Sequence, residues 1–340
     1  MTIPPSRQRT ALARGFYTGG SLPHLETNRQ AAVPHTEGSL IHRKQQRSKL
    51  KRNEQWYGFL FIAPMALGYA FFLLGPILAS FVMSFTNWSI LHPLHFIGFD
   101  NYIKLFTRDD VFIGTAMHTF YFTLCLVPLN IFITLGLALL LKDGIPGIGF
   151  FRTAIFTPVV TSIVVWAIVW KYIFQTDNGL LNMLLRLLHM EGRAWLYDMK
   201  LAIPIVVAVT LFKGLGMNMV IFIAALNDVP RANYEAAQID GASRWRMFCN
   251  VTLPLISPSL FLVVIITVIG SLKVFGQIYV MTGGGPGTSS YVFVYYIYEQ
   301  AFKMYEFGYA SAIAFVLFFI ILALTIVQWV GRKRWVHYEQ

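Results

Sequence analysis

The stretch GYASAIAFVLFFIILALTIVQWV, Gly308 to Val330, decides the fold class because it is long, apolar and free of Asp, Glu, Lys and Arg. A helix needs roughly 20 apolar residues to cross about 30 Å of hydrocarbon, since each residue adds about 1.5 Å of rise. This stretch meets that requirement. It therefore predicts a helix that spans a membrane.

Five further stretches of the same kind precede it, and the composition of the whole chain agrees with them. The 340 residues are 56% hydrophobic and only 13% charged, whereas about a quarter of the residues of a soluble domain are charged. None of the six stretches contains Asp or Glu, and the lysines among them are Lys171, Lys213 and Lys273. We therefore predict an all-α integral membrane protein with six transmembrane helices. The other five expected spans are Tyr57 to Phe85, Phe112 to Leu141, Thr153 to Ile173, Leu201 to Asn227 and Leu255 to Met281.

The net charge of +11 is distributed unevenly between the connecting segments. Residues 37–56, 142–152, 228–254 and 331–340 together carry more than twice as many Lys and Arg as the other three loops. Because positively charged loops stay on the cytoplasmic side, both termini are expected in the cytoplasm. The basic balance is then an orientation signal in a chain surrounded by membrane lipid, and we expect no nucleic-acid partner.

The chain is expected to have two parts. Residues 1–50 are rich in Pro, Ser, Thr, Gln, His and Arg and lack apolar periodicity, so we predict a disordered cytoplasmic N-terminal tail. Residues 51–340 form the expected transmembrane domain. The first apolar run is too long for a signal peptide and follows Lys49, Lys51 and Arg52, which indicates an uncleaved anchor.

The most informative connecting segment is DVPRANYEAAQIDGASRWRMFCNVTLP, residues 228–254. Pro230 can begin a helix, and Arg231 to Ile239 contains good helix formers. Gly241 tolerates a left-handed turn, Ser243 can cap a second short helix, and Pro254 suits the first turn of the fifth span. The segment predicts a helix, a turn and a second helix, joined rigidly to the fourth and fifth spans.

The spacing of this segment resembles the EAA signature of the inner-membrane permease subunits of binding-protein-dependent ABC importers. The matching residues are Glu235-Ala236-Ala237, Gly241 and Val251-x-Leu253-Pro254, with Val251 where the family usually has Ile. Likeness to the carbohydrate-uptake branch appears in Ala224 to Leu226, Asp240-Gly241-Ala242-Ser243 and Tyr279 to Pro286 (YVMTGGGP). The likeness extends from about Trp56 to Val330 and leaves out the N-terminal tail.

The resemblance implies a type I ABC importer permease fold in the bacterial inner membrane. It implies that residues 228–254 dock on a cytoplasmic ATPase, with Glu235 as charged contact, Ala236 and Ala237 allowing close approach and Gly241 giving the turn. Asp240 and Pro254 belong to the same coupling set. The implied partners are a second homologous permease, two ATPase subunits, an extracytoplasmic solute-binding protein and a carbohydrate solute.

The chain itself is expected to be non-catalytic and to hold no cofactor. ATP and Mg would bind the partner ATPase subunits. No Gly-Lys-Ser or Gly-Lys-Thr follows the glycines of TGGGPGT, residues 282–288, so they do not form a phosphate-binding loop of that type. The histidines are scattered, with no His-Glu-x-x-His sequence, so we expect neither a metal site nor an intramembrane enzyme.

Polar residues inside the fourth and fifth expected spans are candidates for the solute path. An unpaired charge in hydrocarbon costs about 2.5–3.5 kcal/mol on insertion scales, so such residues face water or protein. We nominate Lys213, Asn218, Lys273, Gln277 and Tyr279; hydrogen bonding between helices is the alternative role for each. If both lysines line the path, an acidic sugar or a sugar phosphate is a plausible solute. An ion-coupled secondary transporter is the alternative function, but it typically uses intramembrane carboxylates, which these spans lack.

Overall fold

We describe a computed structural model that covers residues 56–90, 93–142, 146–334 and 336. The chain divides into two units between Leu67 and Gly68. The described part of the first unit, from residue 56 onward, is helical, and the second unit contains the candidate functional residues. The predicted disordered tail lies outside the described residues.

The described part of the chain is helical, and apart from its helices it contains one isolated bridge, between Thr86 and Phe96. This confirms the all-α prediction. The helices of the second unit are α2 (Gly75–Met83), α3 (Asp100–Thr107), α4 (Asp110–Leu141), α5 (Ile148–Val160), α6 (Ile163–Ile173), α7 (Leu180–Leu187), α8 (Ala202–Asp228), α9 (Arg231–Ile239), α10 (Arg244–Met247), α11 (Leu253–Leu255), α12 (Ser257–Leu272), α13 (Gly276–Met281), α14 (Phe293–Tyr298) and α15 (Phe307–Gly331). Short π-helical turns occupy Ala70–Leu74, Phe248–Thr252 and Glu299–Lys303.

Four helical segments among the described residues are long and apolar enough to cross a membrane: Trp56–Met83, Asp110–Leu141, Ala202–Asp228 and Phe307–Arg334. Two bent helix pairs meet the same criteria together, which gives up to six spans when each pair counts as one. The four unbroken segments agree with the predicted spans to within a few residues at most ends.

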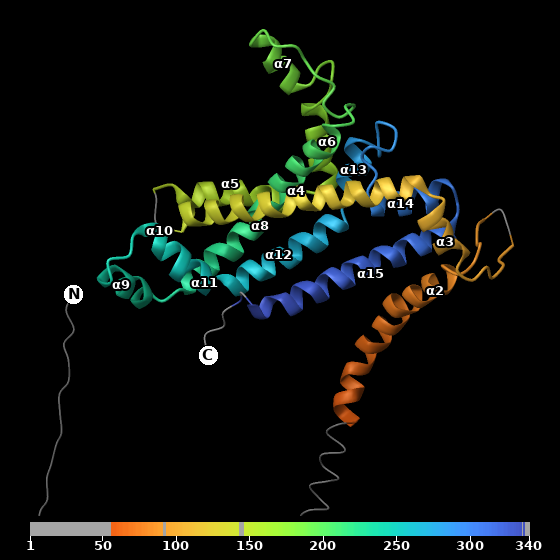
Figure 1. The fold of residues 1–340 in the computed structure, drawn as a ribbon, viewed down its shortest axis with the longest axis horizontal. Coiled ribbons are helices and arrows are strands. Elements are labelled where there is room, and N and C mark those ends of the chain that lie inside the picture. Colours follow the sequence, from red (N-terminus) through yellow and green to blue (C-terminus); the bar gives the residue numbers. More distant parts are fainter. Residues whose placement is uncertain (1–55, 91–92, 143–145, 335, 337–340) are drawn as a thin grey trace, which may run out of the picture. The chain divides into compact units, whose positions relative to one another are not determined.

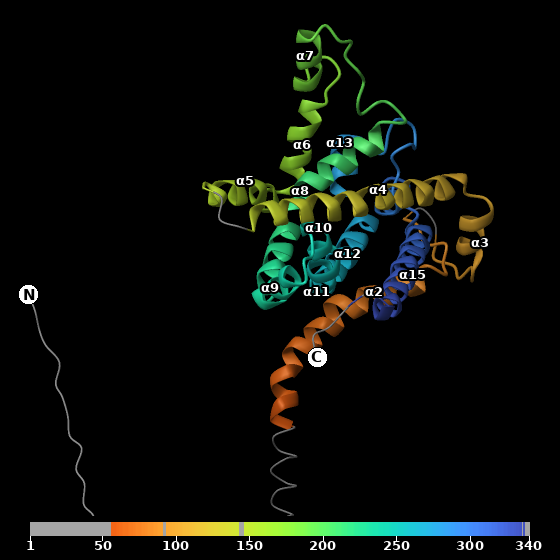
Figure 2. The ribbon, with the colours of Figure 1, turned by 60° about the vertical axis from the view of Figure 1, so that its left-hand side comes forward.

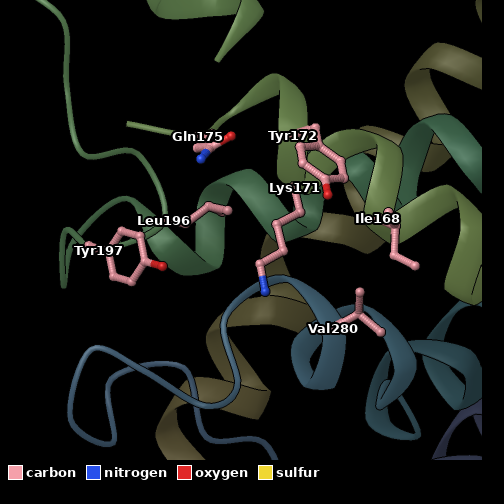
Figure 3. Close-up of a pocket in the computed structure, with 7 residues that line it drawn as sticks. All are labelled: Ile168, Lys171, Tyr172, Gln175, Leu196, Tyr197 and Val280. Carbon is pink, nitrogen blue, oxygen red and sulfur yellow. The ribbon is translucent and has the colours of Figure 1, made fainter. Parts of the chain in front are cut away.

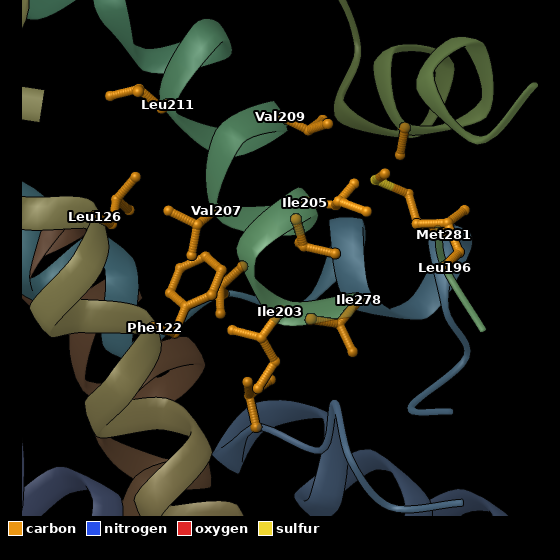
Figure 4. Packing of buried hydrophobic residues seen from close by; sticks show 14 of the residues in the cluster. Phe122, Leu126, Leu196, Ile203, Ile205, Val207, Val209, Leu211, Ile278 and Met281 are labelled. Carbon is orange, nitrogen blue, oxygen red and sulfur yellow. The ribbon is translucent and has the colours of Figure 1, made fainter. Parts of the chain in front are cut away.

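The centre of the second unit is built on α4, α8 and α12, which lie side by side (Figure 1). Figure 4 shows one of its apolar clusters, where Phe122 and Leu126 of α4 pack toward the first half of α8. The same cluster includes Ile278 and Met281 of α13. These contacts pack α13 against α8.

The third predicted span, Thr153 to Ile173, is wrong as a single helix. The segment begins earlier, as α5, and is broken between α5 and α6, whose axes differ by 104°. Thr161 and Ser162 are extended, with ψ near 138° for both. Pro158 lies just before the break and removes one backbone donor from the last turn of α5, which weakens the helix there. Figure 2 shows α6 leaving the direction of α5.

The fifth predicted span, Leu255 to Met281, also needs correction. Pro254 belongs to the separate short helix α11, and the span itself starts with α12 at Ser257, where Pro258 occupies the first turn. The pair Arg244–Leu255 and Ser257–Leu272 is bent by 68°. At its other end α12 stops at Leu272, and residues 273–275 separate it from α13.

Candidate functional site

The segment of residues 228–254, named the coupling loop from here on after the role that the resemblance implies for it, has the local structure that the sequence predicts. Helix α9 follows Pro230, and its end forms a Schellman motif: Ala242 N donates to Ala237 O at 2.9 Å and Gly241 N donates to Gln238 O at 3.0 Å. Gly241 has φ +73°, the left-handed conformation that L side chains rarely adopt. The predicted helix and turn are therefore confirmed.

The second half of the coupling loop is a short helical run. Ser243 Oγ accepts a hydrogen bond from Arg246 N at 3.4 Å, so the predicted cap of α10 is confirmed. A π-helical turn, Phe248–Thr252, continues into α11. The run therefore reaches the start of α12 with little irregular chain between its helical pieces.

The base of the coupling loop is packed into the membrane helices. The hydroxyls of Tyr234 and Thr252 lie 3.1 Å apart and share a hydrogen bond, which ties α9 to the π-helical turn. The ammonium of Lys142, at the end of α4, lies 5.4 Å from the centroid of the Tyr234 ring. The apolar cluster at this base includes Leu141, Phe222, Leu226, Val229 and Ile256, with Tyr234, Phe248 and Leu253 packed against it. The base of the loop is therefore in packed contact with residues of α4, α8 and α12.

The far surface of the coupling loop is open. Glu235, Ala236, Asp240 and Gly241 are exposed, whereas Ala237 and Pro254 are partly buried. Two large apolar side chains of the loop are also exposed, Ile239 at 87% and Trp245 at 71%. A rigid turn that presents a carboxylate, small residues and uncovered apolar groups is suited to contact with another protein.

Lys213 of α8 lies at the break between α5 and α6. Its Nζ donates to Pro158 O at 2.8 Å and to Thr161 O at 2.6 Å. These carbonyls are at the end of α5, where helix geometry leaves carbonyls without the usual donor one turn further on. Lys213 therefore joins α8 to the broken helix.

Asn218, also in α8, is 7% exposed and donates through Nδ2 to Oδ1 of Asn130 in α4 at 2.7 Å. The bond joins two membrane helices, an arrangement common between spans. Asn218 and Lys213 thus have contacts with neighbouring helices, and their nomination for the solute path stays a prediction.

The other three path candidates lie around the break between α12 and α13. Lys273 directly follows α12 and is exposed, Gln277 is 8% exposed within α13, and Tyr279 is 45% exposed. The Tyr279 ring stacks on Phe275, with centroids 5.4 Å apart. Helix α13 packs on α6. The two breaks are therefore linked. Lys213 lies at the first break, Lys273, Gln277 and Tyr279 lie around the second, and Asn218 lies between α8 and α4.

Sequence reasoning missed Asp109, which joins three helices near the start of α4. Its Oδ1 accepts from Phe112 N at 3.0 Å, and its Oδ2 accepts from Tyr296 Oη at 2.6 Å and from the hydroxyl of Tyr309. Burial, followed by the hydrogen bond to Asp109, raises the pKa of Tyr296. An Asp before a helix is a recognisable cap, but its tyrosine partners lie 187 and 200 residues away and give no local signal.

A second missed residue, Asn182, organises the segment between α6 and α8. Its side chain is fully buried. Its Nδ2 donates to the carbonyls of Thr176 and Arg193, both at 2.8 Å, and its Oδ1 accepts from Arg193 N at 3.1 Å and Trp195 Nε1 at 2.7 Å. This one amide holds both ends of the segment, so the segment has a defined shape.

The fold and the coupling loop define a helical membrane permease subunit, and comparison with known proteins gives the family. The model of the family described as "Binding-protein-dependent transport system inner membrane component" matches residues 130–336. The chain is 36% identical over 275 residues to "Probable ABC transporter permease protein YurN" of Bacillus subtilis (strain 168), which covers 79% of this chain and 94% of that protein. It is 34% identical over 293 residues to "Lactose transport system permease protein LacF" of Rhizobium radiobacter, covering 84% and 97%.

The fold agrees with a solved structure described as "Crystal structure of a bacterial ABC transporter involved in the import of the acidic polysaccharide alginate", with a TM-score of 0.74 and 24% identity. The match covers 85% of this chain and 99% of the other. The chain belongs to the family of inner membrane components of binding-protein-dependent transport systems, with the type I permease fold.

Proposed function

We propose that this chain forms part of the solute path of an ATP-driven saccharide importer and that the coupling loop carries the motion of the ATPase into the membrane helices. The observation that carries this proposal is the combination of an exposed rigid turn with a base packed on α4, α8 and α12. A loop built in this way can transmit force because its root does not move independently of the spans.

A saccharide is the solute class that the named relatives favour. Besides LacF they include "Sulfoquinovosyl glycerol transport system permease protein SmoG" of Agrobacterium fabrum (strain C58 / ATCC 33970), 32% identical over 270 residues, which covers 79% of this chain and 87% of that protein. These names describe those proteins, and they support the same broad class of solute for this chain.

The proposed assembly contains a second permease, two cytoplasmic ATPase subunits that bind ATP and Mg, and an extracytoplasmic solute-binding protein. The chain would lie in the bacterial inner membrane with both termini in the cytoplasm, and it would catalyse no covalent step. A structural relative is described in complex with an "alginate pentasaccharide-bound periplasmic protein", which supports a binding-protein partner here.

The test reverses the charge of the exposed carboxylate of the coupling loop. We expect Glu235→Lys to leave the assembled transporter intact in detergent and to reduce ATPase stimulation by the solute-loaded binding protein at least tenfold, because the lysine cannot make the contact proposed for the carboxylate. ATP hydrolysis and saccharide uptake are measured in proteoliposomes.

Glu191→Lys is the matched control, since Glu191 is an exposed glutamate outside the coupling loop. This variant should show the same ATPase stimulation and the same saccharide uptake as the wild type. Normal stimulation and uptake by Glu235→Lys would show that this carboxylate is not part of the coupling contact and would remove the central support for the proposal.

A further inference from the structure

A small cup lies where the end of α6, the turn before α8 and α13 meet. Its cavity is about 360 Å³ and is lined by Ile168, Lys171, Tyr172, Gln175, Leu196, Tyr197 and Val280. Figure 3 shows the Lys171 ammonium between Tyr197 and Val280, with the Tyr197 hydroxyl on the side of its ring that faces Lys171. Sites for small ligands are typically about 300–1,000 Å³, so the cup can accept one or two sugar rings.

The polar lining of the cup consists of one ammonium, two phenols and one amide, with no carboxylate. Lys171 forms no ion pair within the described residues. A cation with hydrogen-bond donors beside it favours an anionic partner, and the exposed faces of Tyr172 and Tyr197 provide surfaces for a sugar ring.

The walls of the cup are held in place. Leu196 is 4% exposed and packs in the apolar cluster that contains Ile278 and Met281 of α13. Trp195, its neighbour, donates to the buried Asn182. The segment that carries Tyr197 is therefore fixed to α13 on one side and to the Asn182 network on the other.

The ammonium of Lys171 in the cup and the ammonium of Lys213 differ in their surroundings. The Lys213 ammonium already has two carbonyl acceptors, at 2.8 and 2.6 Å. Lys171 is exposed beside an open cavity. The cup is also next to the path candidates in sequence, because Val280 follows Tyr279 on α13.

We propose that the cup of Lys171, Tyr172, Gln175 and Tyr197 receives the acid group of an anionic saccharide on its way to the membrane path. This inference rests on the proposed function and adds to it a solute class and a site. The Lys171 ammonium pairs with the carboxylate of the saccharide. The phenols of Tyr172 and Tyr197 and the amide of Gln175 form hydrogen bonds with the hydroxyls of the sugar rings.

The test uses the assembled transporter in lipid nanodiscs without nucleotide, and its probes are radiolabelled trigalacturonate and neutral maltotriose. Equilibrium dialysis should give saturable binding of trigalacturonate that weakens with salt, and at least tenfold weaker binding of maltotriose. Lys171→Met should weaken trigalacturonate binding at least tenfold, and Tyr197→Phe a few-fold. Lys200→Met, an exposed lysine on the neighbouring segment, should bind as the wild type does.

Absence of saturable trigalacturonate binding, or equal binding by Lys171→Met and Lys200→Met, would overturn the inference. A second result would also overturn the inference: the wild type binds no probe, and the Lys171→Met complex loses the second permease. The cup would then serve subunit assembly. Stimulation of ATPase activity by the solute-loaded binding protein is measured on the same samples. If stimulation is intact while trigalacturonate does not bind, the proposed function stands and only the cup is wrong.

Discussion

At the scale of single residues, a few polar side chains link elements that are distant in sequence. Asn130 and Asn218 join α4 to α8, Lys213 joins α8 to the end of α5, and Asp109 joins α4 to α14 and α15. Each satisfies donors or acceptors that would be costly to leave unpaired away from water. These residues specify which helices pack together, a choice that apolar surfaces alone leave open.

Asp109 gives the clearest test at this scale. We expect Asp109→Ala to lower the free energy of unfolding by about 2 kcal/mol, because two tyrosine hydroxyls and one backbone amide lose their charged acceptor. Thermal unfolding of the purified protein in detergent measures the change. Asp110→Ala removes the adjacent exposed carboxylate and should change stability by less than about 0.5 kcal/mol. Equal losses in the two variants would contradict the assigned role of Asp109.

At the scale of helices, the approach of α8 to α5 depends on one glycine. A Cβ on Gly216 would lie 2.7 Å from Ile155 O and 2.7 Å from Phe156 Cα, both backbone atoms. A Cβ on Gly214 would meet only Asn130 Nδ2, at 3.5 Å. The two glycines are on the same helix, but only Gly216 is at a contact that excludes any side chain.

We therefore expect Gly216→Ala to destabilise the protein by about 1–3 kcal/mol through overpacking against α5, and Gly214→Ala to be tolerated. Unfolding midpoints in detergent, compared side by side, provide the measurement. If the alanine at position 216 were accepted as readily as the one at 214, the close contact of α8 with α5 would not exist in solution.

The sequence predicted the membrane helices and the coupling loop well because both depend on local signals. Apolar length defines a span, and Gly241 and Ser243 define the turn and the cap. The break between α5 and α6 was missed because local pattern does not separate a proline that ends a helix from one that a helix tolerates: Pro158 precedes this break, whereas Pro128 lies inside the continuous α4. The break at residues 273–275 contains no proline, so it has no signal of this kind. The contacts of Asp109 were missed because its tyrosine partners are 187 and 200 residues away. Those of Asn182 were missed because its partners lie in irregular chain, which has no periodic pattern to predict its shape.

At the scale of the second unit, the coupling loop, the central helices and the two helix breaks form one connected structure. The base of the loop packs on α4, α8 and α12, and Lys213 connects α8 to the first break. Because α13 packs on α6, the second break is joined to the first. Movement at the loop therefore has a continuous packed route to the segments that carry the path candidates.

This proposed coupling requires the loop and the cup to be on opposite sides of the membrane. Glu191 lies in the segment between α7 and α8 that also carries Tyr197 of the cup. We expect Glu191→Cys, made in a variant that lacks Cys125 and Cys249, to react with an impermeant maleimide in intact spheroplasts. Ile239→Cys, which is 87% exposed on the coupling loop, and Gln340→Cys should react only after permeabilisation. The asymmetry of Lys and Arg between the two sets of loops gives this expected sidedness. Labelling of Ile239→Cys in intact spheroplasts would place the coupling loop outside the cell, away from any cytoplasmic ATPase.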